Sequence, residues 1–226
     1  MVEALAQDGW EPLIHCHRSR EEADALVARI GKGRVVVADL AGPDPCASFR
    51  AALTDMPPPG LLVNNASRFE LDDLDDFDVA QWTAHFDANL RAPALLTQMF
   101  AELAGQGGLI VNMLDAKLVQ PNPDFFTYTL SKMGLAGLTE LSARKLAGRA
   151  IRACGIAPSV TLVSGPQSRE NFSAVHRMNA LSRGVQVDEI VSALRFLIAT
   201  PTITGQTIVL DGGLRFMGFQ RDVQFM

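Results

Sequence analysis

The chain has 226 residues, enough for one domain of ordinary size. Hydrophobic residues make up 48% and charged residues 20%, so a sizeable core can be buried and global disorder is excluded. A formal net charge of −5, with no basic block, argues against binding of nucleic acid or of an anionic membrane surface. No apolar run is long enough to span a bilayer and no export signal opens the chain, so we expect a cytoplasmic protein.

In chain order, apolar spacing and breaker residues predict helices and strands that alternate. The expected elements are a helix ending at Asp8, a strand at 12–17, a helix from 19 to 31, a strand at 34–38, a helix through 49–53, a strand at 61–63, a helix over 79–104, a strand at 109–113, a helix over 126–147, a strand at 151–156, a helix over 187–198 and a strand at 207–210. This pattern predicts a single doubly wound α/β domain over residues 1–226, with one parallel sheet and helices on both faces. Ligands are then expected beyond the carboxyl ends of the strands.

Three groups of residues are poor candidates for a metal site. The three cysteines, Cys16, Cys46 and Cys154, are too scattered for a zinc knuckle or a disulfide framework. His15 and His17 flank Cys16, but strand alternation sends Cys16 to the opposite face, so we expect no metal there. The acidic run from Glu70 to Asp78 is expected to cap and solvate the following helix rather than to bind a cation.

The single tyrosine, Tyr128, is followed four residues later by Lys132. Positions i and i+4 of a helix share a face, so the phenol and the ammonium can point into one site. A cation near a phenol favours the phenolate, which predicts a lowered pKa for Tyr128. The alternative for these two residues alone is an ordinary solvated helix surface.

Further candidates follow the predicted strands. Asp115 comes just after the strand at 109–113, and the segment 64–67 (Asn-Asn-Ala-Ser) follows the strand at 61–63. Pro93 has no N–H, so the backbone carbonyl of Asn89 loses its helical partner. A carbonyl freed in this way can hold a water for proton relay; the alternative is a simple proline kink.

Together these motifs resemble the short-chain dehydrogenase/reductase family, from Met1 to about Phe216. The family's Tyr-x-x-x-Lys corresponds to Tyr128 and Lys132, its Asn-Asn-Ala-Gly to residues 64–67, and its helix asparagine to Asn89. The final strand and its turn, 205–213, fit as well. The family usually has serine at the position of Asp115.

That aspartate makes the chain similar to the pteridine reductases within the family, which include dihydromonapterin and dihydrofolate reductases of this fold. Their His-x-His-Arg-Ser turn matches 15–19, and the segment 158–163 resembles theirs, with serine at Ser159 in place of the usual glycine. In that group the phenylalanine corresponding to Phe69 stacks on the pterin ring. The resemblance therefore implies NADPH-dependent hydride transfer to a pterin or folate-like small molecule.

The resemblance also assigns site residues. The catalytic residues would be Asn89, Asp115, Tyr128 and Lys132, and the substrate-binding residues Phe69, Asp115 and Tyr128. The cofactor-binding residues would be His17, Arg18, Ser19, Asp39, Leu40, Asn65, Ala66, Ser67, Tyr128, Lys132, Pro158 and Ser159. Arginine and a helix N-terminus suit a 2′-phosphate better than a ribose hydroxyl, which favours NADPH; the alternative is a surface arginine and a capping serine.

Several expectations complete this interpretation. The family's first strand and its Thr-Gly-x-x-x-Gly-x-Gly turn would precede Met1, so we expect the sheet to lack a central strand. A misassigned start codon or a truncated chain is favoured over an evolved deletion. If no Gly-rich segment lies upstream of Met1, we expect weak or absent NADPH binding by this chain. The resemblance implies a homotetramer, and the segment 164–184 is expected to be a mobile substrate lid. The alternative functions are reduction of another carbonyl substrate, or a catalytically silent member that acts as a binding or scaffold subunit.

Overall fold

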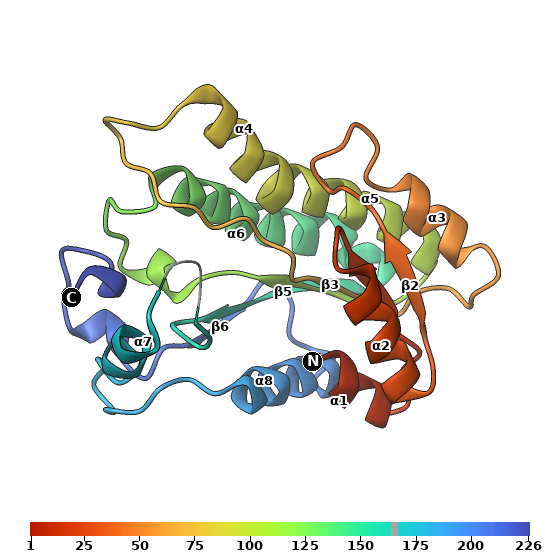
Figure 1. Ribbon diagram of the computed structural model, residues 1–226. Helices are drawn as coiled ribbons and strands as arrows, with labels where there is room; N and C mark the ends of the chain where they lie inside the picture. Colours follow the sequence, from red (N-terminus) through yellow and green to blue (C-terminus); the bar gives the residue numbers. More distant parts are fainter. Residues whose placement is uncertain (164–166) are drawn as a thin grey trace.

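A computed structural model describes residues 1–163 and 167–226 (Figure 1). Every strand pairing in these residues is parallel. The strands are β1 (Leu13–Cys16), β2 (Arg34–Val37), β3 (Leu61–Asn64), β4 (Gly108–Met113), β5 (Ile151–Pro158) and β6 (Thr207–Leu210). The predicted α/β fold with a doubly wound parallel sheet is thereby confirmed.

Helices connect the strands. They are α1 (Val2–Gln7), α2 (Arg20–Ile30), α3 (Ala47–Leu53), α4 (Val79–Phe86), α5 (Ala92–Ala104), α6 (Phe126–Leu146), α7 (Arg169–Val175) and α8 (Val187–Ala199), with a π-helical segment η1 (Asp87–Arg91). Short 3₁₀ segments are η2 (Ala116–Val119), η3 (Ala147–Arg149), η4 (Leu214–Phe216) and η5 (Val223–Phe225). No helix in the described parts of the chain is long and apolar enough to cross a membrane.

The sheet is divided into two parts. β1 pairs with β2, and β3, β4, β5 and β6 pair in that order, but no pairing joins β1 to β3 within the described residues. In the fold predicted above, this break is where the family's first strand would lie. That this strand is missing from the chain stays a prediction.

Two layers of helices cover the sheet. In Figure 1, α4, α5 and α6 lie on one side, and α1 and α8 on the other. Buried residues of β4 and β5 pack against α8 in one core cluster, and Ile110 of β4 packs with α5 and α6 in another. The carboxyl ends of the strands therefore remain the open edge at which loops gather.

The predicted elements are confirmed, with two differences. The long helix expected over 79–104 is interrupted by η1, which lies just before Pro93 and accommodates the proline's missing donor. α7 was not predicted; Ser168 caps it by accepting a hydrogen bond from the Asn171 backbone N–H at 3.1 Å. The expected lid at 164–184 lies partly outside the described residues.

Candidate active site

A cavity of about 530 Å³ opens where the strands end. Its walls come from the segments that follow β3, β4, β5 and β6 and from the C-terminal tail. Among the predicted site residues, it is lined by Asn65, Ser67, Phe69, Asp115, Tyr128, Lys132, Pro158 and Ser159. The structure thus brings together, from four segments of the sequence, most residues that the motifs singled out.

Tyr128 and Asp115 meet inside this cavity. The phenol Oη donates a hydrogen bond to Asp115 Oδ2 at 2.8 Å, and Asp115 Oδ1 accepts one from the Lys117 backbone N–H at 2.8 Å. Burial and the neighbouring Asp115 carboxylate raise the pKa of Tyr128 well above its ordinary value. The sequence-based prediction of a lowered pKa was therefore wrong in this structure, because desolvation and an acid outweigh the lysine. Tyr128 is a protonated phenol, which can donate a proton.

Lys132 lies one helical turn after Tyr128 on α6, as predicted. Its Nζ is 5.8 Å from the centre of the Tyr128 ring and donates a hydrogen bond to the backbone carbonyl of Met113 at 2.8 Å. The side chain is buried, and this burial lowers the pKa of Lys132 to about 8. A lysine held in this way presents its remaining N–H donors to the cavity.

Asn89 lies in η1 and is fully buried behind the cavity. Its side-chain amide donates to the Arg68 carbonyl and to Ser131 Oγ, both at 2.9 Å, and its Oδ1 accepts from the Arg68 backbone N–H at 2.7 Å. These bonds fasten the loop after β3 to α6. The side chain therefore organises the site from behind, and the carbonyl's relay role stays a prediction.

Aromatic rings build one wall of the site. The Phe69 ring stacks on Phe125 with centres 4.2 Å apart, and its edge-to-face contact with Tyr128 is 4.7 Å. Phe125 in turn stacks on Phe225 at 5.9 Å. A flat substrate ring can stack on this series at low entropic cost, because the rings that it would contact are already held in place by their neighbours.

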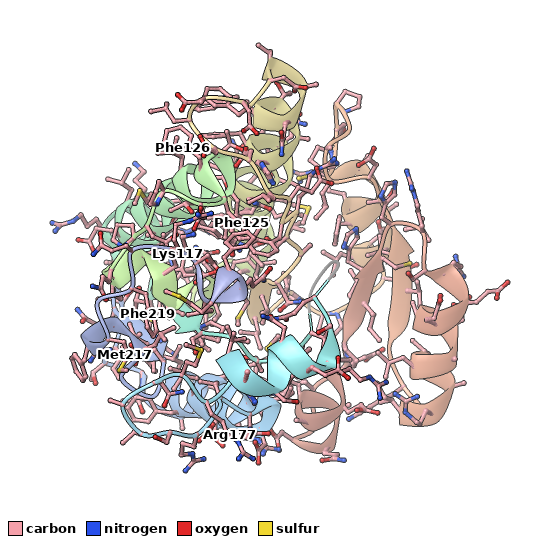
Figure 2. The ribbon with its side chains drawn as sticks, turned by 60° about the vertical axis from the view of Figure 1, so that its left-hand side comes forward. Lys117, Phe125, Phe126, Arg177, Met217 and Phe219 are labelled. Atoms are coloured by element: carbon pink, nitrogen blue, oxygen red, sulfur yellow. The ribbon has the colours of Figure 1, made fainter. Side chains whose placement is uncertain are left out.

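The C-terminal tail, residues 214–226, closes another wall, which sequence reasoning missed. The buried Asp124 carboxylate accepts both Arg221 Nε, at 2.8 and 2.9 Å, and the Asp222 backbone N–H at 2.6 Å. Lys117 Nζ bridges the Asp124 carbonyl and Asp222 Oδ2, 3.1 Å away, and lies 5.2 Å from the Phe125 ring centre (Figure 2). Burial alone would raise the pKa of the Asp124 carboxyl. Arg221 and the Asp222 backbone N–H instead hold this pKa below its ordinary value.

Phe125 adopts an unusual backbone conformation at the start of α6. Its φ of +55° lies in the left-handed region, which a large L-residue rarely occupies. Stacking on Phe69 and Phe225 and the nearby Lys117 ammonium compensate for this strain. The sequence carried no signal for it, because the conformation is imposed by contacts between distant segments.

The residues predicted to bind the adenosine end of a cofactor lie outside the cavity. His17, Arg18 and Ser19 follow β1 and Asp39 follows β2; all four are exposed, as is Ala66. Arg18 forms no ion pair with any described residue, and Ser19 precedes α2 without capping it through its side chain. Because β1 and β2 are parallel neighbours, these groups share one edge of the sheet. Leu40 packs in the core with Val36 and Phe49, so its role in cofactor binding stays a prediction.

One acidic residue differs from expectation. Asp78 caps α4, as predicted, by accepting a hydrogen bond from the Gln81 backbone N–H at 2.7 Å. Asp72, from the same acidic run, is instead buried and accepts a hydrogen bond from the Thr127 backbone N–H at 3.1 Å. The prediction that the whole run is solvated was therefore wrong for Asp72, because an unpaired N–H at the start of α6 provides a partner.

Residues 1–215 match the family described as enoyl-(acyl carrier protein) reductase. The chain belongs to this family of short-chain dehydrogenases/reductases. A crystal structure of FolM alternative dihydrofolate reductase 1 from Brucella suis in complex with NADP is 38% identical, with a TM-score of 0.91, covering 95% of this chain and 89% of that one. The corresponding Brucella canis structure, also complexed with NADP, is 39% identical, with a TM-score of 0.90, covering 95% and 88%.

Curated relatives carry several reductase activities. The 3-oxoacyl-(acyl-carrier-protein) reductase of Synechocystis is 29% identical and covers 93% of this chain and 89% of its own length. Pteridine reductase 1 of Leishmania tarentolae is 28% identical, covering 94% and 90%. L-xylulose reductase of Cavia porcellus is 29% identical, covering 89% and 85%. The family assignment is therefore firm, while these relatives differ in substrate.

Proposed function

We propose that this protein is an NADPH-dependent oxidoreductase that reduces a C=N bond of a pterin-type small molecule. Family membership and the NADP-bound Brucella structures support the first half of this statement. The observation that carries the second half is the Asp115 carboxylate, 2.8 Å from the Tyr128 phenol in a cavity walled by Phe69. The alternative dihydrofolate reductases and the pteridine reductase among the relatives point to the same substrate class.

The residues present fit a nicotinamide cofactor. Lys132 Nζ and the Asn65 and Ser159 side chains offer hydrogen-bonding groups along the cavity, suited to the nicotinamide ribose and amide. Arg18 has no acidic partner among the described residues, so its guanidinium is available to bind the 2′-phosphate of NADPH. When bound, NADPH supplies a hydride.

The chain's own residues manage the proton. Reduction of C=N requires one proton at nitrogen for each hydride at carbon, and the high pKa of Tyr128 keeps its phenol protonated for this transfer. After the phenol gives its proton to the substrate nitrogen, a proton from solvent restores it. Lys132 holds a positive charge near the phenolate while it exists.

Asp115 and Phe69 select the substrate. The amino and ring N–H groups of a pterin can donate to the Asp115 carboxylate, whereas the serine usual in this family offers a single hydroxyl. Phe69 provides an aromatic surface for a flat bicyclic ring. A tetrameric assembly and a cytoplasmic location remain further parts of this proposal.

A substrate panel tests the proposal. The protein is assayed for NADPH oxidation with dihydrobiopterin, dihydromonapterin and dihydrofolate, and in parallel with a 3-oxoacyl thioester and L-xylulose. We expect turnover of at least one pterin with a kcat/KM well above that of either ketone. Turnover of a ketone without turnover of any pterin would remove the pterin assignment and favour the 3-oxoacyl or xylulose reductases as functional relatives.

A further inference from the structure

A buried hydrogen-bond network lies behind the substrate wall and has no part in the mechanism above. It joins His85 of α4, Thr127 of α6 and Asp72 of the loop before α4, whose exposed fractions are 0%, 0% and 3%. His85 Nδ1 is 2.6 Å from Thr127 Oγ1, and Thr127 Oγ1 also contacts Asp72 Oδ2. Burying polar groups this deeply costs free energy unless each group has a hydrogen-bond partner. A fully satisfied buried network also fixes the positions of its members.

The available protons fix the direction of each bond. The Glu70 backbone N–H donates to His85 Nε2 at 3.2 Å, so this nitrogen carries no proton. The ring proton is therefore on Nδ1 and is donated to Thr127 Oγ1. The Thr127 hydroxyl then donates its own proton to the Asp72 carboxylate. His85 is neutral in this arrangement, which agrees with the lowering of its pKa by burial.

The same carboxylate is tied to the first turn of α6. Asp72 Oδ1 accepts a hydrogen bond from the Thr127 backbone N–H at 3.1 Å, and the Asp72 carbonyl accepts one from the Phe126 N–H at 3.3 Å. These N–H groups have no partner within the helix, and the helix dipole favours a negative charge at this end. Asp72 thus anchors the loop between β3 and α4 to the end of α6 that carries Tyr128.

Each end of the network adjoins a residue of the substrate wall. Glu70 follows Phe69, and Thr127 precedes Tyr128. The loop between β3 and α4 has no regular secondary structure of its own, so its position depends on such attachments. The loop that carries Phe69 and the helix that carries Tyr128 are thus joined through the Thr127 hydroxyl. This connection supports the edge-to-face contact of Phe69 with Tyr128, whose ring centres are 4.7 Å apart.

We propose that Thr127, together with His85 and Asp72, is a positioning residue that fixes the Phe69 ring against the Tyr128 phenol and thereby sets the affinity of the site for a flat substrate ring. This inference rests on the proposed function, because it takes Phe69 as the surface on which the pterin stacks. None of the three residues lines the cavity. They act through Phe69 and Tyr128 rather than by touching the substrate.

Substitutions at Thr127 separate positioning from general stability. Thr127→Val keeps the shape and removes the hydroxyl, leaving the His85 N–H and one Asp72 oxygen unsatisfied; Thr127→Ser keeps the hydroxyl. Thr97→Val is the matched control, since Thr97 is also a buried helical threonine but its Oγ1 has no hydrogen-bond partner in the described residues. Two readouts are measured for each variant: the dissociation constant of biopterin from the NADP-saturated enzyme, by pterin fluorescence, and the KM values for dihydrobiopterin and NADPH.

We expect Thr127→Val to raise the biopterin dissociation constant and the dihydrobiopterin KM by roughly tenfold or more, and the NADPH KM by less than about twofold. Thr127→Ser should give values close to those of the wild type, and Thr97→Val should change neither the biopterin dissociation constant nor the two KM values. Should Thr127→Val fail to fold, His85→Phe is measured in its place with the same expectation.

Wild-type pterin affinity in the folded variant, or an equal rise in both KM values, would overturn the positioning role. A wild-type enzyme that turns over no pterin would instead contradict the proposed function itself, and with it the role stated here for a pterin. The two failures are therefore distinguishable.

Discussion

At the scale of single residues, the site is governed by burial more than by the charges read from the sequence. The spacing of Tyr128 and Lys132 correctly predicted that both would enter one site. It gave the wrong direction for the tyrosine pKa, because the spacing of two residues says nothing of desolvation or of a third group. Asp115, from another strand, supplies that group through its hydrogen bond to the phenol.

The lysine offers a test through the pH dependence of stability. The pKa of Lys132 in the folded protein, about 8, lies below its ordinary value of 10.5. Between these two values the unfolded chain binds more protons than the folded one, so the free energy of unfolding rises with pH across this window. The full effect is roughly 3 kcal/mol at most. Tyr128, whose pKa is raised above its ordinary value of 10.0, opposes this rise only from about pH 10 upward.

Urea denaturation at several pH values from 7.5 to about 10 measures this effect, with Lys132→Met as the comparison. The wild type should gain stability relative to Lys132→Met as the pH rises through 8. Parallel stability curves for the two proteins would show that Lys132 keeps an ordinary pKa when folded.

At the scale of elements, the features that could not be predicted from the sequence lie mostly in the loops and in the C-terminal tail. The strands and long helices follow from apolar periodicity, and η1 follows from the absent N–H of Pro93. The C-terminal tail is different: only the folded chain shows that Asp124, Arg221 and Asp222 dock it beside the cavity. Such contacts join residues far apart in sequence, which local patterns cannot encode.

The docked tail predicts a difference between two of its phenylalanines. Phe225 stacks on Phe125, whereas Phe216 is 71% exposed and does not contact that ring series. Phe225→Ala should raise the KM for the pterin several-fold, because Phe125 loses the ring that holds it behind Phe69, and should lower the melting temperature by a few degrees.

Phe216→Ala is the matched control and should leave both quantities close to the wild type. Steady-state kinetics and thermal denaturation of the two variants provide the comparison. Equal effects of the two substitutions would mean that the tail does not support the substrate wall.

At the scale of the whole molecule, the predicted architecture is confirmed, and a cavity lies at the strand ends, where ligands were expected. Parallel sheets and their open carboxyl edge follow from alternation of buried strands with helices, which the sequence displays directly. The buried network of His85, Thr127 and Asp72 was not predictable, since Asp72 sits among acidic residues that look solvated. Its partners, His85 and Thr127, lie on α4 and α6, and they become neighbours of Asp72 only when the two helices and the loop pack together.

The central claim is that Asp115 makes this member of the family a pterin reductase, and Asp115→Ser in the full-length protein tests it most directly. The variant's kcat/KM for the best pterin and its dissociation constant for NADPH are measured beside those of the wild type. Because the serine cannot replace a carboxylate that accepts from both the pterin and the phenol, kcat/KM should fall by roughly a hundredfold or more. The NADPH dissociation constant should stay within about threefold of the wild-type value. Unchanged pterin turnover, or an equal loss of turnover and of NADPH affinity, would contradict the account.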